Sequence, residues 1–404
     1  MILTSMKPKY LLFLLTSSLL TACQPKAEVD TEIPVANFRE LIANPSTLSL
    51  NEEIKQVEYI PLHTTEDEQS LIDGVAGFAV TSKHIYVYPV KEQCLALFSR
   101  QGDFIRTLIT FGQGPGEFND MLSDIQANEE HNRLYLFGMS GIWEYTLEGE
   151  YIIKYEYKQL AIFLRLLSAD KLGAVAFPYM PFKDGSFGLG IFTLQGDTIA
   201  MKNNFDASEI APEKAGFTIR SAASYTPADN SILFKMGAND TIFRITDKTI
   251  EPACVLQLNN SDKEVRMSID ATDFGSMQDF GSPSDIIISE IMETPSCYYF
   301  RLRYDEGHFV AALHKKTGKA MIEKCIQPAD LATLSDANLL CGMLGTRSYG
   351  NFPIWGRIEN DCLAQIITPY ELSLYKETGK ITIPEALQGV GEDDNPIVIL
   401  YHLK

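Results

Sequence analysis

Apolar and polar residues alternate with a period of two through much of the chain, which predicts β-strands. "IYVYPVKEQCLALFSRQGDFIRTL" (Ile85 to Leu108) and "LYLFGMSGIWEYTLEGEYIIKY" (Leu134 to Tyr155) share one pattern: a strand, a short connection, a strand, a polar turn with Gly, and a strand. β-branched and aromatic residues fill the strands, and no unit sustains an apolar period of 3.6 residues. The pattern predicts antiparallel meanders and excludes a helical solenoid.

The unit recurs along the chain. Gly102, Gly149 and Gly196 mark three equivalent turns, each forty-seven residues after the last. Three weaker units follow, at Ile232 to Leu258, Tyr298 to Cys325 and Trp355 to Thr368. A repeat of about 40 to 50 residues that holds several strands is typical of a propeller blade.

Six units predict an all-β fold, a six-bladed β-propeller with antiparallel four-stranded blades over residues 51–404. The open edge of such a ring needs a partner. The strand-like ends, Ile54 to Leu62 and Asn395 to Lys404, lie outside the clear repeats. We expect these N- and C-terminal strands to close the ring.

The first residues predict a lipoprotein signal peptide over residues 1–22. Lys7 and Lys9 precede an apolar run of about ten residues, too short for the roughly twenty of a membrane-spanning helix. Leu20-Thr21-Ala22-Cys23 resembles a lipobox, which predicts acylation of Cys23, with palmitate among the chains. An ordinary secretory peptide is the alternative.

Residues 23–50 are expected to be the lipidated N-terminus and a polar tether. Gln24 in place of Asp resembles lipoproteins sent to the outer membrane. The predicted location is therefore the cell envelope, in the outer membrane, with the periplasmic and surface faces both open.

The charge and the cysteines exclude several classes of function. Loss of Lys7 and Lys9 with the signal peptide takes the net charge from −19 to −21, which argues against nucleic acid and against a peripheral lipid-surface role. Membrane contact is expected through the anchor. None of the other cysteines lies in a C-x-x-C pattern, so zinc, iron–sulfur and thioredoxin-type sites are not expected. We expect no cofactor and no metal.

Two glycine-containing motifs invite functional interpretations. "GQGPGEF" (Gly112 to Phe118) has Glu117 where a phosphate loop would have a third glycine, so we interpret it as an inter-blade crossover with glycines at positive φ. "GEDDNP" (Gly391 to Pro396) offers calcium-type oxygen ligands without EF-hand spacing. A solvated turn before the closing strand is the favoured interpretation.

Two segments outside the repeat interleave aromatics with Pro, Gly, Lys and Arg: "FPYMPFKDGSFG" (Phe177 to Gly188) and "GTRSYGNFPIWGR" (Gly345 to Arg357). Exposed aromatics on a rigid scaffold hold sugars or peptides. We expect the ligand-binding residues to be Tyr179, Lys183, Arg347 and Tyr349. The alternative is that the segments' other aromatics, Phe177, Phe182, Phe352 and Trp355, fill the blade interfaces.

The order of motifs resembles a known family. "GQGPGEF" with the following "NRLYLFGMSGIWEYTLEGEYI" is similar to NHL-type repeats, and "NDTIFRI", "GNFPIWGRI" and "EDDNPIVILYHLK" extend the match. The chain resembles the six-bladed β-propeller lipoproteins of gut-type Gram-negative bacteria. The resemblance implies the fold and no particular reaction.

These observations predict a lipid-anchored propeller that acts as a binding module for an extracytoplasmic ligand, which is a glycan, a peptide or a partner protein. One alternative is a propeller enzyme, a lyase or hydrolase, with its site in the central channel. Another is a scaffold for an outer-membrane assembly. The sequence identifies no catalytic residue and favours a protein that is not an enzyme.

Overall fold

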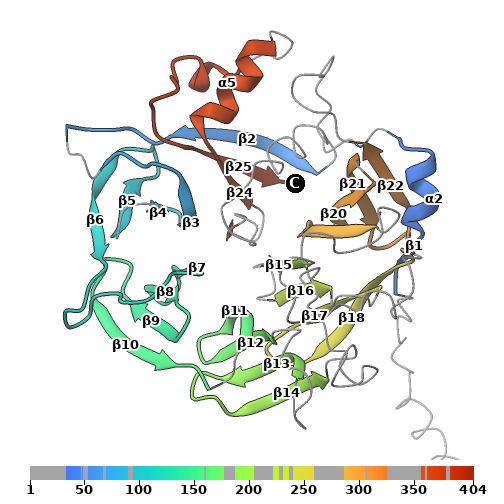
Figure 1. The fold of residues 1–404 in the computed structure, drawn as a ribbon, viewed down its shortest axis with the longest axis horizontal. Coiled ribbons are helices and arrows are strands. Elements are labelled where there is room, and N and C mark those ends of the chain that lie inside the picture. Colours follow the sequence, from blue (N-terminus) through green and yellow to red (C-terminus); the bar gives the residue numbers. More distant parts are fainter. Residues whose placement is uncertain are drawn as a thin grey trace, which may run out of the picture. The chain divides into compact units, whose positions relative to one another are not determined.

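The computed structural model confirms the six-bladed β-propeller. Residues 33 to 404 form one unit, in which six antiparallel sheets are arranged as a ring (Figure 1). The structure describes residues 33–46, 48, 53–66, 70–89, 94–158, 161–176, 187–203, 222–226, 231–235, 240–258, 286–305, 307–324, 356–359, 362–378 and 383–404.

The first three blades follow the sequence order of the repeat, from the innermost to the outermost strand. Blade 1 consists of β3 (Val75–Val80), β4 (His84–Pro89), β5 (Cys94–Ser99) and β6 (Phe104–Thr110). Blade 2 consists of β7 (Asp124–Asn128), β8 (Arg133–Phe137), β9 (Gly141–Tyr145) and β10 (Tyr151–Glu156). Blade 3 consists of β11 (Ala161–Ser168), β12 (Lys171–Ala176), β13 (Phe187–Thr193) and β14 (Thr198–Asn203).

The other three blades keep this order with additions. Blade 4 consists of β15 (Ala222–Thr226), β16 (Ser231–Lys235), β17 (Thr241–Ile245) and β18 (Ile250–Leu256), and β1 (Val35–Ala36) is its fifth strand. Blade 5 consists of β19 (Ile287–Glu293), β20 (Cys297–Tyr304), β21 (Gly307–His314) and β22 (Ala320–Lys324). Blade 6 consists of β23 (Gly356–Glu359), β24 (Cys362–Ile367), β25 (Ile397–Leu403) and β2 (Ile54–Pro61).

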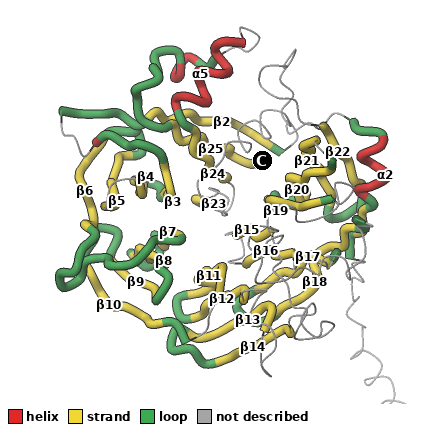
Figure 2. The backbone as a smooth tube through the Cα atoms, viewed as in Figure 1, coloured by secondary structure: helices red, strands yellow, loops and turns green. Residues whose placement is uncertain are grey.

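The two ends of the propeller close the ring as the sequence predicts. β2 pairs with β25 in antiparallel register, from Ile54 opposite Leu403 to Pro61 opposite Ile397. The outermost strand of the last blade therefore comes from the start of the propeller, while its other three strands come from the end (Figure 2).

The hydrophobic core is divided among the blade interfaces. Separate clusters of buried side chains join blades 6 and 1, blades 1 and 2, blades 2 and 3, blades 3 and 4, and blades 4 and 5, and a further cluster packs β20 and β21 against Leu48 and Ile54. Apolar residues on both faces of each blade are thus buried, which explains the strand pattern of the sequence.

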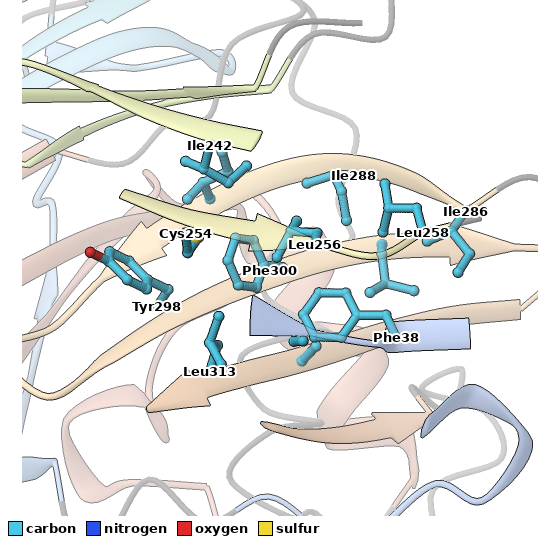
Figure 3. Close-up of a cluster of buried hydrophobic side chains, with 14 of the residues drawn as sticks. Phe38, Ile242, Cys254, Leu256, Leu258, Ile286, Ile288, Tyr298, Phe300 and Leu313 are labelled. Atoms are coloured by element: carbon cyan, nitrogen blue, oxygen red, sulfur yellow. The ribbon is translucent and has the colours of Figure 1, made fainter. Parts of the chain in front are cut away.

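Residues within the expected tether form secondary structure on blades 4 and 5. β1 pairs in parallel with β18, and α2 (Phe38–Ala43) follows with Asn37 as its N-cap. Phe38 is fully buried, with its ring 5.4 Å from that of Phe300 in an edge-to-face contact (Figure 3). Phe38, Leu41 and Ile42 have the spacing of one face of a helix. The sequence analysis missed this short helix because the residues before it are polar.

A long connection in blade 6 also holds helices that the strand pattern did not predict. α5 (Pro369–Thr378) and the 3₁₀ helix η6 (Glu385–Leu387) lie between β24 and β25, and Leu372 and Leu387 are buried against blade 6. No helix in the described parts of the chain is long and apolar enough to cross a membrane.

The repeated glycines have a structural reason. Gly102, Gly149 and Gly196 have φ values of 92°, 89° and 90°, and a Cβ at each would overlap the end of the preceding blade, at Pro61, Leu108 and Lys158. Each turn between the third and fourth strands thus packs without a side chain against the neighbouring blade. The left-handed conformation and the close approach both require glycine.

The crossover interpretation of "GQGPGEF" is confirmed, because the motif joins β6 to β7, but the expectation for its glycines is only partly right. Gly116 has a φ of 79°, whereas Gly112 and Gly114 do not have positive φ. Instead, the Glu117 carboxylate folds back over the loop and accepts a hydrogen bond from the Gly114 N–H at 2.7 Å. A Cβ on Gly112 or Gly114 would collide with this carboxylate.

The blade 6 to blade 1 contact can be tested with two glycine substitutions. Gly102→Ala should lower the free energy of unfolding by about 3 kcal/mol or more, because it combines a left-handed backbone with a collision against the Pro61 carbonyl. Gly318→Ala is the control, since Gly318 has a φ of 66° and nothing lies within 4 Å of its Cβ position. It should cost only about 1 kcal/mol. Equal losses in urea denaturation would contradict the packing argument.

Candidate functional site

The five site residues expected from the sequence, Cys23, Tyr179, Lys183, Arg347 and Tyr349, lie outside the described residues. The strands that bracket the two aromatic segments are described. Tyr179 and Lys183 fall between β12 and β13, and Arg347 and Tyr349 fall between β22 and β23.

The innermost strands run in the same direction around the centre of the ring. The Gln126 side chain of β7 donates a hydrogen bond to the Leu166 carbonyl at 3.0 Å and accepts one from the Leu166 N–H at 3.1 Å. Arg165 Nη1 lies 3.4 Å from the Ile125 carbonyl oxygen. Residues 125 and 126 therefore lie beside residues 165 and 166, so β7 and β11 are parallel, as all six innermost strands of a propeller are.

This direction gives the ring one face at which the innermost strands begin, here called the entry face. Because strand direction alternates within a blade, β12 ends and β13 begins at the entry face. β23 is an innermost strand and also begins there. One face therefore holds the end of β12 and the start of β13, between which Tyr179 and Lys183 fall. The same face holds the start of β23, which follows Arg347 and Tyr349.

A charged pair marks the entry face between blades 2 and 3. Asp124, the first residue of β7, lies 3.0 Å from Arg165 Nε of β11, and its Oδ1 accepts a hydrogen bond from the Ile125 N–H at 2.8 Å. Burial raises the pKa of Asp124, and the Arg165 charge and the Ile125 N–H offset only part of this effect. Yet 28% of the Asp124 side chain is accessible, so solvent reaches part of it.

Two further polar groups lie near this pair. Asp120 Oδ2 accepts a hydrogen bond from the Ser140 N–H at 2.7 Å, and the Tyr157 N–H donates one to the Ser140 carbonyl at 3.1 Å. The Tyr157 hydroxyl is buried and has no hydrogen-bond partner among the described residues. Burial raises its pKa, and the negative charges of Asp120 and Asp124 raise it further, so the phenol remains a proton donor.

An apolar surface borders this corner. Met121 and Met139 are 66% and 55% exposed, and each is the chain neighbour of a residue in the Asp120–Ser140 contact. Carboxylate acceptors, a guanidinium and a phenol donor beside exposed thioether side chains suit a ligand with several hydroxyl or amide groups. No pattern in the sequence predicted this corner, because its members are spread over about forty-five residues without a motif.

The calcium hypothesis for "GEDDNP" finds no support in the described geometry. The Asp394 carboxylate accepts a hydrogen bond from the Gly391 N–H at 2.7 Å, as in a turn. Asn395 is fully buried, where its side chain accepts from the Ile72 N–H and donates to the Ser70 carbonyl. Within the described ranges, no three His, Cys, Asp or Glu side chains lie together so that they could hold a metal.

The histidines and cysteines that the structure describes have structural surroundings. His63 lies 3.0 Å from Asp103, and His402 lies 3.3 Å from Glu58, both where blade 6 meets blade 1. Cys254, Cys297 and Cys362 are buried, and Cys94 is half-buried. Burial raises the pKa of Cys254 and Cys297, which keeps both thiols protonated and unreactive.

A buried ion cluster joins blades 4 and 5. Glu293 at the end of β19 contacts Arg244 of β17, at 2.5 Å, and Lys315. Burial alone would raise the pKa of Glu293, but the two cations outweigh this effect and hold the pKa below its usual value. Arg244 also donates a hydrogen bond to Ser231. The cluster lies between blades, and we interpret it as structural.

The Asp124–Arg165 pair predicts a pH-dependent stability. Because the folded state raises the Asp124 pKa, folding takes up a proton between the ordinary and the raised value, and stability falls as the pH rises through that window. Arg165→Met should leave a buried carboxylate unpaired and cost about 3 kcal/mol at neutral pH. Most of this loss should disappear as the pH falls through the raised pKa of Asp124, because the carboxyl group is then neutral.

The double variant Asp124→Asn, Arg165→Met is the control, because it removes the charge together with its partner. Its stability should lie near that of the parent at neutral pH and should not recover in acid. Denaturant titrations at several pH values measure both variants. A loss in Arg165→Met that is the same at every pH would show that packing, and not the charge of Asp124, is the cause.

The chain is similar to solved structures of Bacteroides proteins. An exported protein from Bacteroides fragilis, known from its crystal structure, shares the fold with a TM-score of 0.62 at 15% identity, and the alignment covers 89% of this chain and 98% of that one. A member of the DUF4221 family from Bacteroides vulgatus aligns with a TM-score of 0.49 at 11% identity, over 88% of this chain and 99% of that one.

A comparison with curated protein sequences found no match. The family model described as a domain of unknown function, DUF4934, matches residues 33–402, which is nearly the whole propeller. The chain therefore belongs to the DUF4934 family.

Proposed function

We propose that this protein is a lipid-anchored propeller of the cell envelope that binds an extracytoplasmic ligand at its entry face. One observation carries the proposal: the strand ends around both aromatic segments and the polar corner at Asp124, Tyr157 and Arg165 share that face. Long connections on one side of a rigid scaffold are where such folds bind ligands.

The chemistry of the corner favours a glycan over a peptide or a partner protein. Sugar hydroxyls match the mixture of carboxylate acceptors and Arg and Tyr donors, and an apolar surface packs against the C–H face of a sugar ring. Tyr179 and Tyr349 would stack on the ring, while Lys183 and Arg347 would bind carboxylate or sulfate groups.

The location rests on the lipobox at Cys23 and on Gln24 after it. The similar Bacteroides fragilis structure is described as an exported protein, which agrees with an envelope location. Acylation of Cys23, and membership of an NHL-like lipoprotein family, are parts of this proposal.

A channel enzyme is the second candidate, and the Asp124 pKa favours it. A carboxyl group with a raised pKa beside an arginine and a buried phenol is a group that can act as a general acid. The two candidates differ in one result: an enzyme would convert a bound glycan, and Asp124→Asn would stop conversion while binding remained.

The anchor is tested by Cys23→Ser, which removes the acylated thiol. The variant should leave the membrane fraction and appear in the soluble envelope fraction, because three acyl chains anchor a protein stably and the acidic propeller has no other predicted affinity for lipid. A variant that still sediments with membranes at high salt would contradict the lipoprotein proposal.

Ligand binding is tested with a glycan and peptide array on the soluble mature protein, followed by titration of each hit. The double variant Tyr179→Ala, Tyr349→Ala should bind at least about tenfold more weakly without a change in melting temperature, since each stacking contact contributes about 1 to 2 kcal/mol. Tyr179→Phe, Tyr349→Phe is the matched control, because it keeps the rings. Unchanged affinity in the alanine variant, or loss of binding with EDTA, would place the site elsewhere.

A further inference from the structure

The N-terminal part of the propeller unit is attached to blades 4 and 5. β1 pairs with the end of β18, where the Val255 N–H donates a hydrogen bond to the Pro34 carbonyl at 2.9 Å. α2 contacts β22, and Arg39 Nε donates a hydrogen bond to the Leu258 carbonyl at 3.1 Å. The chain that comes from Cys23 therefore joins the propeller at one defined place on its outer rim.

The connection between this place and the expected anchor is short. Nine residues, Gln24 to Glu32, separate Cys23 from Ile33, the first residue of the propeller unit. A fully extended chain spans at most about 3.6 Å per residue, so the acylated residue would lie within about 36 Å of Ile33. The rim of blades 4 and 5 must therefore stay close to the bilayer, whereas no such limit applies to the opposite rim.

The exposed charges on the outer rim of blade 5 are positive. The turn before β22 and β22 itself contain three exposed lysines, Lys316, Lys319 and Lys324. The other charged residues of this segment, Lys315 and Glu323, are half-buried. The segment therefore exposes three positive charges and no negative one.

Blade 2, which lies opposite blade 5 in the ring, has the reverse charge on its outer rim (Figure 1). Its corresponding segment, the turn before β10 and β10 itself, exposes three acids, Glu148, Glu150 and Glu156. Lys154 of this segment is half-buried, with its ammonium 4.2 Å from the centre of the Trp143 ring. The outer rim of the propeller thus has a positive side at blade 5 and a negative side at blade 2.

The residues around the attachment in blade 4 are nearly neutral. The outer strand of this blade, its preceding turn and α2 expose one lysine and two acids, which are Lys248, Glu251 and Glu40. Asp247 of the same turn lies 3.4 Å from Lys171. The lysines of blade 5 therefore give the attachment side of the rim its net positive charge.

We infer that the outer rim at blades 4 and 5 is the surface that the propeller turns toward the membrane, with Lys316, Lys319 and Lys324 facing anionic lipid headgroups. This inference rests on the proposed acylation of Cys23. The tether alone would allow the ring to lie flat or to stand on this rim. The charges favour the second arrangement, because the same headgroups attract the lysines of blade 5 and repel the acids of blade 2. The lysines orient a protein that the acyl chains hold, since a chain this acidic does not stay on lipid without them.

This orientation places the proposed ligand corner on the side away from the bilayer. Asp124 belongs to blade 2, and Tyr157 follows the outermost strand of that blade. The entry face would stand at a steep angle to the membrane instead of lying against it. A ligand that approaches from the aqueous side would therefore reach the corner without competition from lipid.

The test compares four equivalent positions around the ring by energy transfer to the membrane. Gln101, Glu148, Gln195 and Thr317 each stand directly before a turn glycine at positive φ, in blades 1, 2, 3 and 5, and all four are exposed. A donor dye is attached through p-azidophenylalanine introduced at one of these positions in each variant. The acylated protein is reconstituted into vesicles of phosphatidylethanolamine and phosphatidylglycerol that carry an acceptor dye on a headgroup.

Transfer should be strongest from Thr317, weakest from Glu148 on the opposite blade, and intermediate from Gln101 and Gln195. Opposite rims of a domain of this size lie roughly 40 to 50 Å apart, so transfer from Glu148 should be at least about twofold lower than from Thr317. A ring that lies flat would give equal transfer from all four positions, because they are equivalent in their blades. Equal transfer, or strongest transfer from Glu148, would overturn the inference.

The contact with headgroups is tested by Lys316→Gln, Lys319→Gln, Lys324→Gln. This triple variant should lose a large part of the difference in transfer between Thr317 and Glu148, and high salt should act on the parent in the same way. Lys83→Gln is the control, because Lys83 is an exposed lysine in a turn of blade 1, and it should keep the difference. A difference that the triple variant retains in full would show that the lysines do not face the lipid.

A second preparation separates this inference from the proposed acylation. The chain from Gln24 onward, with a hexahistidine tag in place of Cys23, is bound to the same vesicles through a nickel-chelating lipid. It should give the same order of transfer. The mass of the protein purified from membranes tests acylation by itself, so a missing acyl chain would contradict the proposed function. A different order of transfer in the tagged protein would contradict the orientation.

Discussion

The pairing of β2 with β25 is the contact on which the ring depends. It joins residues more than three hundred positions apart, so it closes a very long loop, and the packed blades between its ends offset the entropic cost of that closure. Around it, Arg100 binds Glu58 at 3.1 Å, and Gly102 packs beneath Pro61. The closing blade therefore holds blade 1 through backbone, charge and packing together.

Local patterns predicted the blades well because each blade is built mainly from neighbouring strands. The glycine turns, the alternation and the strand-like ends all depend on residues close in sequence, and the structure confirms them. The two-residue strand β1 and the helix α5 carry too little periodicity to stand out from a connection. "GQGPGEF" shows another limit. Gly116 is required by a positive φ, whereas Gly112 and Gly114 are required by close packing against Glu117, and the sequence does not distinguish these two reasons for a glycine.

The corner at Asp124 could not be predicted for a different reason. Asp124 and Arg165 belong to equivalent strands of successive blades, so only the curvature of the ring brings them to 3.0 Å. The alternation along a strand predicts on which side of the sheet a side chain lies, but it does not predict which residues of the next blade that side chain contacts. The same holds for Glu293, whose two cations come from different blades. Blade count follows from local sequence, whereas interface chemistry follows from the assembled ring.

The accuracy of the repeat changes along the chain together with the covering of the outer edges. In blades 1 to 3, the spacing of forty-seven residues holds for the turn glycines and for the second residue of each outermost strand, an exposed isoleucine that forms a bulge, and no described element covers the outer strands. In blade 4, Ile250 pairs with Ile245 as Tyr151 pairs with Tyr145 in blade 2, so the residue that forms the bulge in blades 1 to 3 has no equivalent there. Among the described residues, the repeat is thus most exact in the blades whose outer strands no helix or strand covers, and it diverges where β1, α2 and η6 are added.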